Sequence, residues 1–155
     1  MNPEEKRAFA ESPAGRQAAQ DYLAGLQNLN VAIALKHAQA DGLREKVKRI
    51  SEMPKTGDTP EGQADTITAR LDHLEQEVLA DYHTLLERRQ AIQNTIRRVP
   101  NAAQRTVLEM RYVESMPFFR IAMAMNYGER TVFRLHRKAL AQTALYLMET
   151  GEIEA

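Results

Sequence analysis

Apolar residues recur at spacings of three and four over two long stretches, and this periodicity constrains the fold more than any other feature. The first stretch runs from Asp21 to Ile50 and the second from Asp65 to Arg98. Such spacing places side chains on one face of a helix, whereas a half-buried strand requires strict alternation of apolar and polar residues. Alternating runs rich in Val, Ile and Thr are nearly missing. The sequence therefore predicts an all-α fold.

Residues 51–62 separate the two stretches and contain Pro54, Gly57, Pro60 and Gly62. They predict a loop, with Thr59 as the N-cap of the second helix. Two helices of similar length joined in this way favour a long antiparallel hairpin, coiled-coil-like, over residues 21–99.

Two details qualify the predicted hairpin. The first stretch predicts a single long helix with Asp41-Gly42 as its weak point and a bend there as an alternative, because glycine inside a helix costs about 1 kcal/mol relative to alanine. The apolar stripe of the second helix widens at Leu79 and Leu86. This widening predicts a further contact, either from a partner chain or from the C-terminal helices.

The remaining segments lie on either side of the hairpin. Residues 1–20 predict a weakly ordered lead-in in which Ser12 and Pro13 can start a helix. Residues 100–148 predict a second domain whose first helix is capped by Asn101 and ends at about Val113. Residues 149–155 form an acidic tail. The expected pattern on that first helix is exposed Arg105 and Arg111 over buried Val107, Leu108 and Tyr112.

The composition excludes several kinds of chemistry. Cysteine is absent, so neither disulfides nor thiolate zinc sites can form. No apolar run approaches the roughly 20 residues that cross a bilayer, and the N-terminus has no apolar signal region. We therefore expect a cytoplasmic protein without a membrane partner.

Histidine–glutamate pairs are the nearest approach to a metal site. His73 with Glu77, and His83 with Glu87, are each four residues apart on the predicted second helix, but no further ligand accompanies them. No nucleophile motif and no glycine-rich phosphate loop occurs. The sequence predicts neither an enzyme nor a metal or other cofactor.

The stretch from Pro117 to Leu140 predicts two short helices joined at Asn126–Gly128. This is the layout of a helix-turn-helix, whose second helix lies in the DNA major groove. We expect the recognition helix at residues 129–141.

Positive charge is concentrated in this part of a chain whose formal net charge is zero. With about 100° per residue and Val132 as origin, Arg137, Arg130, Arg134 and Lys138 lie at about 140–240°, opposite the apolar face. Cations on an outer helix face can simply be solvated, but the preceding helix and short turn favour contact with double-stranded DNA. The predicted DNA-binding residues are Glu129, Arg130, Thr131, Phe133, Arg134, Arg137 and Lys138.

The same residues resemble region 4 of bacterial sigma-70-type factors. The similarity lies in Val107-Leu-Glu-Met-Arg-Tyr112, Arg120-Ile-Ala122, Thr131-Val132 and Lys138-Ala-Leu140. Most of the chain, about residues 20–145, is similar to the ArpU/RinA-like phage and prophage late regulators. That similarity rests on Tyr22-Leu23, Arg111-Tyr112, Ile121-Ala122 and the stretch Tyr127-Gly-Glu-Arg-Thr-Val-Phe-Arg-Leu-His136. Arg120 replaces the usual acidic residue, and Gly128 replaces a serine.

The resemblance implies a phage- or prophage-encoded, sequence-specific transcription regulator of late genes, with host RNA polymerase as a second candidate partner. The helical hairpin is then expected to form a homodimer or to dock on that partner. An alternative is a DNA-packaging or assembly factor, similar to a terminase small subunit, whose hairpin oligomerises into rings.

Overall fold

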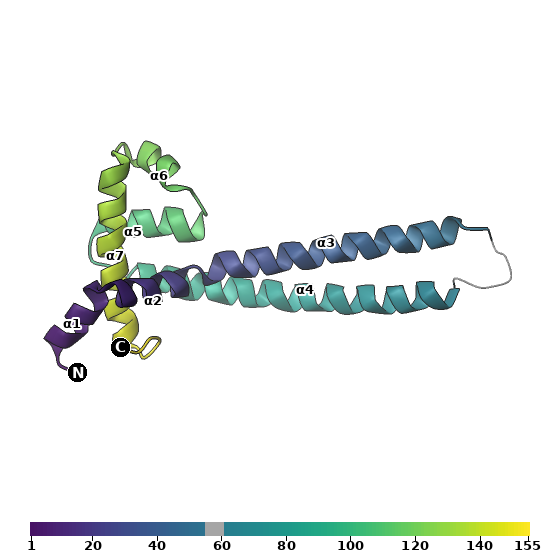
Figure 1. Ribbon diagram of the computed structural model, residues 1–155, viewed down its shortest axis with the longest axis horizontal. Coiled ribbons are helices and arrows are strands. Elements are labelled where there is room, and N and C mark those ends of the chain that lie inside the picture. Colours follow the sequence, from purple (N-terminus) through teal and green to yellow (C-terminus); the bar gives the residue numbers. More distant parts are fainter. Residues whose placement is uncertain (55–60) are drawn as a thin grey trace. The chain divides into compact units, whose positions relative to one another are not determined.

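The computed structural model describes residues 1–54 and 61–155, and it places no β-strand within these ranges. The helices are α1 (Pro3–Glu11), α2 (Pro13–Leu23), α3 (Gly25–Glu52), α4 (Glu61–Ile96), α5 (Ala102–Leu108), the π-helical η1 (Glu109–Val113), α6 (Phe118–Met125) and α7 (Glu129–Glu149). The all-α prediction is confirmed for the described residues (Figure 1). The sequence predicts the loop at residues 51–62, but helices take up both of its ends. Helix α3 extends to Glu52, and α4 begins at Glu61. The predicted cap Thr59 lies outside the described residues.

The chain divides into two compact units, one of Met1–Asn28 with Glu87–Ala155 and the other of Leu29–Leu86. This division differs from the predicted boundary at residue 100. The last turns of α4 belong to the first unit, in which Ile92 and Ile96 are buried. Tyr22 adds a hydrogen bond between its hydroxyl and the Thr95 hydroxyl at 3.3 Å.

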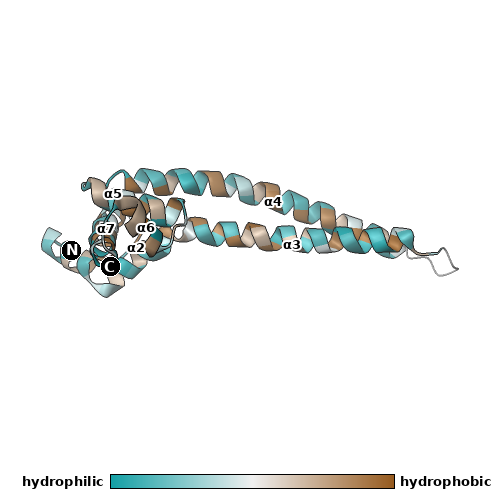
Figure 2. Ribbon diagram, turned by 90° about the horizontal axis from the view of Figure 1, so that it is seen from above, coloured by the Kyte–Doolittle hydropathy of each residue, from teal (hydrophilic) through white to brown (hydrophobic). Residues whose placement is uncertain are grey.

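In the unit Leu29–Leu86, α3 and α4 run antiparallel (Figure 1). Lys36 Nζ lies 2.6 Å from Asp81 Oδ2, and Arg44 Nη2 lies 2.9 Å from Glu75 Oε1. The two ion pairs show the antiparallel direction, because the residue numbers rise along α3 while those of their partners fall along α4. Both helices carry recurring hydrophobic residues between hydrophilic ones (Figure 2). The buried ones are Ile33, Ala40, Leu74 and Val78. The single helix that the sequence predicts through Asp41-Gly42 is confirmed, since α3 is continuous from Gly25 to Glu52.

In the other unit, α7 is the central helix and contacts α1, α2, α5 and α6. Its buried side consists of Val132, Ala139, Leu140, Thr143, Ala144 and Leu147. Figure 1 shows α6 at the N-terminal end of α7, and α1 and α2 beside its C-terminal half. Packing against these helices therefore buries one side of α7.

The prediction of a weakly ordered lead-in at residues 1–20 is wrong. Asn2 and Glu5 form a reciprocal capping box at the start of α1, and Ser12 caps α2 ahead of Pro13, as the sequence suggested. The residues that these helices bury include Ala10 and Ala19. Alanine gives a weak hydrophobic signal, so the periodicity did not reveal this contact surface.

The corner between α1 and α2 requires glycine at position 15. A Cβ atom there would lie 2.1 Å from the carbonyl oxygen of Phe9 and 3.0 Å from the Cα of Ala10. Both are backbone atoms, so they cannot move aside as a flexible side chain can. The close approach of α1 to α2 therefore depends on the missing side chain.

We expect Gly15→Ala to lower the free energy of unfolding by about 2 kcal/mol or more, since an inserted methyl forces the two helices apart. Gly42→Ala is the matched control, because no atom lies within 4 Å of its added Cβ. That variant should gain up to about 1 kcal/mol from better helix propensity. Urea unfolding followed by circular dichroism measures both changes. A Gly15→Ala variant as stable as the parent would contradict the described corner.

Candidate nucleic-acid interface

The connection between α6 and α7 consists of Asn126, Tyr127 and Gly128. Asn126 ends α6 in the left-handed region, with φ 58° and ψ 42°, a conformation that asparagine adopts more readily than most residues. The Tyr127 N–H then donates to the Ala122 carbonyl at 3.0 Å. Gly128 is the N-cap of α7 and makes no side-chain capping bond. The connection between the two helices is thus only three residues long.

A small hydrophobic cluster holds α6 against the N-terminal half of α7. Its buried members are Val107 from α5, Ile121 and Ala122 from α6, and Val132 from α7. The partly buried side chains around them are Met110, Met116, Phe118, Met125 and Leu135. Because the cluster draws on three helices, it fixes which side of α7 faces inward.

The opposite side of α7 carries the predicted cations. Arg130, Arg134, Arg137 and Lys138 are all exposed, while Val132, Ala139 and Leu140 are buried. Within the described residues none of the four cations forms a salt bridge. We call these four residues the cationic face.

The other predicted contact residues lie beside the cationic face. Glu129 and Phe133 are exposed, and Thr131 is half-buried. A shallow depression on α7 is lined by Glu129, Arg130, Thr131, Phe133, Arg134 and Arg137. The structure therefore brings all the predicted residues except Lys138 together around one hollow, with Lys138 exposed next to Arg137.

Tyr112 and His136 connect the π-helical turn η1 to α7. The Tyr112 hydroxyl lies 2.7 Å from His136 Nε2. Burial and, to a smaller extent, the charge of Arg111 lower the pKa of His136 to about 4. Burial also raises the pKa of Tyr112 to about 12, so both the phenol and the imidazole are neutral at physiological pH. This pair anchors α7 without adding to its charge.

Two arginines that were expected to be exposed are instead half-buried. Arg105 Nη1 donates to the carbonyls of Val99 and Pro100 at 2.7 and 2.9 Å. Arg111 Nη1 donates to the Met116 carbonyl at 3.1 Å, and its guanidinium lies 4.4 Å from the centre of the Phe118 ring. These arginines satisfy backbone carbonyls where the helices end, and so they do not extend the cationic face. The expected burial of Val107, Leu108 and Tyr112 is confirmed.

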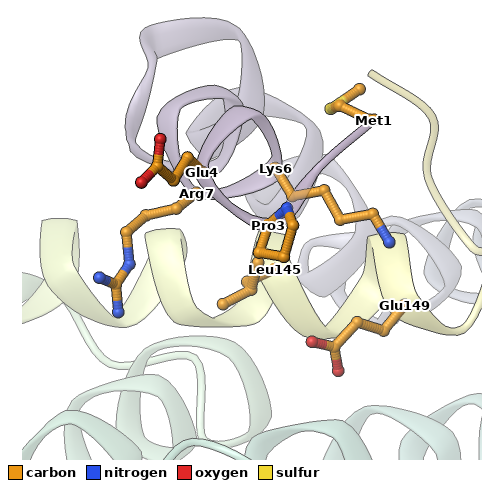
Figure 3. Close-up of a pocket in the computed structure, with 7 residues that line it drawn as sticks. All are labelled: Met1, Pro3, Glu4, Lys6, Arg7, Leu145 and Glu149. Atoms are coloured by element: carbon orange, nitrogen blue, oxygen red, sulfur yellow. The ribbon is translucent and has the colours of Figure 1, made fainter.

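A second hollow, beside α1, carries charges of both signs. The pocket between α1 and the end of α7 contains Lys6 and Arg7 together with Glu4 and Glu149, and Figure 3 shows Lys6 and Arg7 extending in opposite directions. Among the described residues, no three His, Asp or Glu side chains are placed to hold a metal ion. None of the helices described is long and apolar enough to cross a membrane.

Residues 47–144 match the family model described as "Protein of unknown function (DUF1492)". The match covers more than half of the chain, so the chain belongs to this family. It includes α6, the cationic face and both residues of the Tyr112–His136 pair. Comparison with curated proteins and with solved structures gave no match.

The pKa of His136 predicts a loss of stability in mild acid. Its folded-state value of about 4 lies below the ordinary 6.5, so the unfolded chain binds the proton more tightly. The free energy of unfolding should therefore fall as the pH drops from about 7.5 to about 4.5, with about 2–3 kcal/mol due to this residue.

Urea unfolding of the parent and of His136→Gln at both pH values isolates this contribution, because carboxylate titration is common to the two proteins. The parent should lose about 2–3 kcal/mol more than His136→Gln between the two pH values. Equal losses would show that the half-buried His136 is not held neutral in the folded protein.

Proposed function

We propose that this member of the DUF1492 family is a sequence-specific DNA-binding transcription regulator. In this proposal α6 and α7 form a helix-turn-helix and the N-terminal half of α7 is the recognition helix. The observation that carries it is the cationic face: four exposed cations without ion pairs among the described residues, opposite the buried side of α7.

Electrostatics supports a local rather than a global attraction to DNA. Lys and Arg together number 21, as do Asp and Glu, so the whole molecule has no net field to attract a polyanion. An unpaired cation near a phosphate releases a condensed counterion, which is the main source of affinity for the DNA backbone. The four cations of α7 can supply this electrostatic affinity where the helix meets the duplex.

Geometry supports the major groove as the binding site. That groove is about 12 Å wide and admits one α-helix, whose first turns contact the base edges. Arg130 and Arg134 lie in the first two turns of α7, and Arg137 and Lys138 follow in the next. We assign base and phosphate contacts to the first pair and phosphate contacts to the second pair.

The resemblance to sigma-70 region 4 and to ArpU/RinA-like late regulators supports a role in transcription. The residues that carry it include Ile121, Ala122, Val132 and Leu140, which are all buried, so much of the resemblance follows the helix packing. Gly128 leaves the start of α7 without a side-chain cap, and Arg120 is exposed. By this resemblance, we propose late phage or prophage genes as the targets.

We further propose that the protein is a homodimer in which a second copy covers an exposed stripe of α4. The stripe consists of Leu79, Tyr82 and Leu86, with exposed fractions of 70%, 42% and 66%. Spacings of three and four place these residues along one side of the helix, as at a coiled-coil contact.

Charge complementarity favours an antiparallel pairing of the two α4 helices. A two-fold axis near Tyr82 places Leu79 opposite Leu86 of the second copy. It also brings Glu75, which already pairs with Arg44 of its own chain, towards the exposed Arg89 of the second copy at both ends of the stripe. A parallel pairing would place like charges together instead, which is unfavourable.

We expect Arg130→Glu with Arg134→Glu to weaken binding to a selected DNA duplex at least about 30-fold, because each arginine–base contact contributes about 1–3 kcal/mol. The plot of log affinity against log salt should become less steep by about two. Lys48→Glu with Arg49→Glu, two exposed positions on α3, makes the same charge change and should leave affinity nearly unchanged. Fluorescence anisotropy at several salt concentrations measures both pairs. Unchanged affinity in the α7 variant would refute the proposed function.

The proposed dimer can be tested by cysteine cross-linking, because the chain has no cysteine of its own. Leu79→Cys alone should not form a disulfide-linked dimer, since two such residues would lie about 10 Å apart along the helices. An oxidised mixture of Leu79→Cys and Leu86→Cys proteins should give the mixed dimer.

Light scattering of the parent protein should give the mass of two chains. Cross-linking of Leu79→Cys with itself would indicate parallel pairing and contradict the proposed orientation. A ring of many chains would favour the assembly-factor alternative instead.

A further inference from the structure

Two of the residues around the depression on α7 cannot neutralise a phosphate. Glu129 is negatively charged and Phe133 is apolar, yet both are exposed beside the cationic face. They are four residues apart and so lie on one side of the helix, one turn from each other. Their chemistry is suited to base edges, which differ in donors, acceptors and methyl groups.

Phe133 is held in place although 44% of it is exposed. Its ring centre lies 4.8 Å from that of Phe118. Phe118 is fixed in turn by the edge-on ring of His136 at 4.9 Å and by the guanidinium of Arg111 at 4.4 Å. The remaining ring surface of Phe133 is thus presented to solvent by a packed support, which lowers the entropy lost on binding.

The apolar group that the major groove offers to such a ring is the 5-methyl of thymine. A carboxylate such as Glu129 accepts hydrogen bonds only, and it is repelled by phosphates and by the acceptor atoms of guanine. The cytosine N4 amino group is a donor that a glutamate reads in this groove.

We propose that Phe133 reads a thymine methyl and that Glu129 reads a cytosine amino group, so that these two residues determine sequence specificity. The proposal rests on the DNA-binding function proposed above. Four residues of helix rise by about 6 Å, and successive bases are about 3.4 Å apart. The thymine and the cytosine should therefore lie within about two base pairs of each other.

The first experiment selects duplexes from a random pool with the full-length protein and then replaces each thymine of the selected site by deoxyuridine. At one position, loss of the methyl should weaken binding about 4-fold, the ratio that corresponds to about 0.8 kcal/mol for one buried methyl. Phe133→Ala should bind the thymine and deoxyuridine duplexes equally.

Two further variants serve as controls for Phe133→Ala. Phe119→Ala removes another exposed phenylalanine, on α6 and outside the depression, and should keep the 4-fold ratio. Phe133→Leu retains an apolar side chain against Phe118 and should keep part of the ratio. If the parent protein itself shows no thymine position with a methyl effect, the role of Phe133 is refuted.

The second experiment concerns Glu129. In Glu129→Gln the side chain keeps its size, but its amide can both donate and accept, which suits adenine N7 and N6. A repeated selection should replace the cytosine by adenine at one position and leave the thymine position unchanged. An unchanged cytosine preference would refute the role of Glu129.

Failure of this inference is distinguishable from failure of the proposed function. If no sequence is enriched and binding does not depend on Arg130 and Arg134, the DNA-binding function itself is wrong. If a site is enriched but tolerates deoxyuridine throughout, the function stands and the thymine-reading role is wrong.

Discussion

Burial of one side of α7 is the constraint on which the unit Met1–Asn28 with Glu87–Ala155 depends. Helices α1, α2, α5 and α6 all contact α7, and six of its residues are buried. Burial of apolar surface contributes about 25 cal/mol per Å². The free energy gained by packing α7 against four helices therefore outweighs the preference of any single exposed side chain for one rotation of the helix. The rotation of α7 about its axis is therefore set by packing. The position of the cationic face follows from that rotation, so the charged residues need no stabilising partners of their own.

The packed side of α7 carries no charged side chain among the described residues. His136 is the titratable residue of that side, and burial holds it neutral while it pairs with the Tyr112 hydroxyl. A protonated histidine at this place would lie near Arg111, which already lowers the pKa. Arg105 and Arg111 are directed to backbone carbonyls and to the Phe118 ring. The arginines of this region thus have two separate uses: some complete the backbone hydrogen bonding, and others remain available on the surface.

The periodicity of the sequence was sufficient to predict the all-α fold, the long helices and the side of α7 that carries Arg130, Arg134, Arg137 and Lys138. It did not predict α1 and α2, because most of the residues that they bury are alanines and the glycine at position 15, which have a weak apolar signal; Leu23 is the large buried residue of α2. The exposure of Arg105 and Arg111 was also mispredicted, since their roles depend on carbonyls freed where helices end. The support of Phe133 by Phe118 could not be predicted either, because helical spacing carries no information about contacts between helices.

Phe133 packs against a neighbouring helix and also presents part of its surface to solvent. An isolated exposed phenylalanine costs free energy in water and would be free to rotate. Contact with Phe118 reduces both costs, but Phe133 as a residue remains 44% exposed. His136 and Arg111 in turn hold Phe118 in place. His136 is hydrogen-bonded to Tyr112 in the π-helical turn, and Arg111 donates to the Met116 carbonyl in the segment before α6. A change at Tyr112, which touches neither the cationic face nor the depression, would thus loosen His136 and, through Phe118, the ring of Phe133. On this reasoning, base discrimination by α7 depends on the packing beneath it as well as on the side chains at its surface.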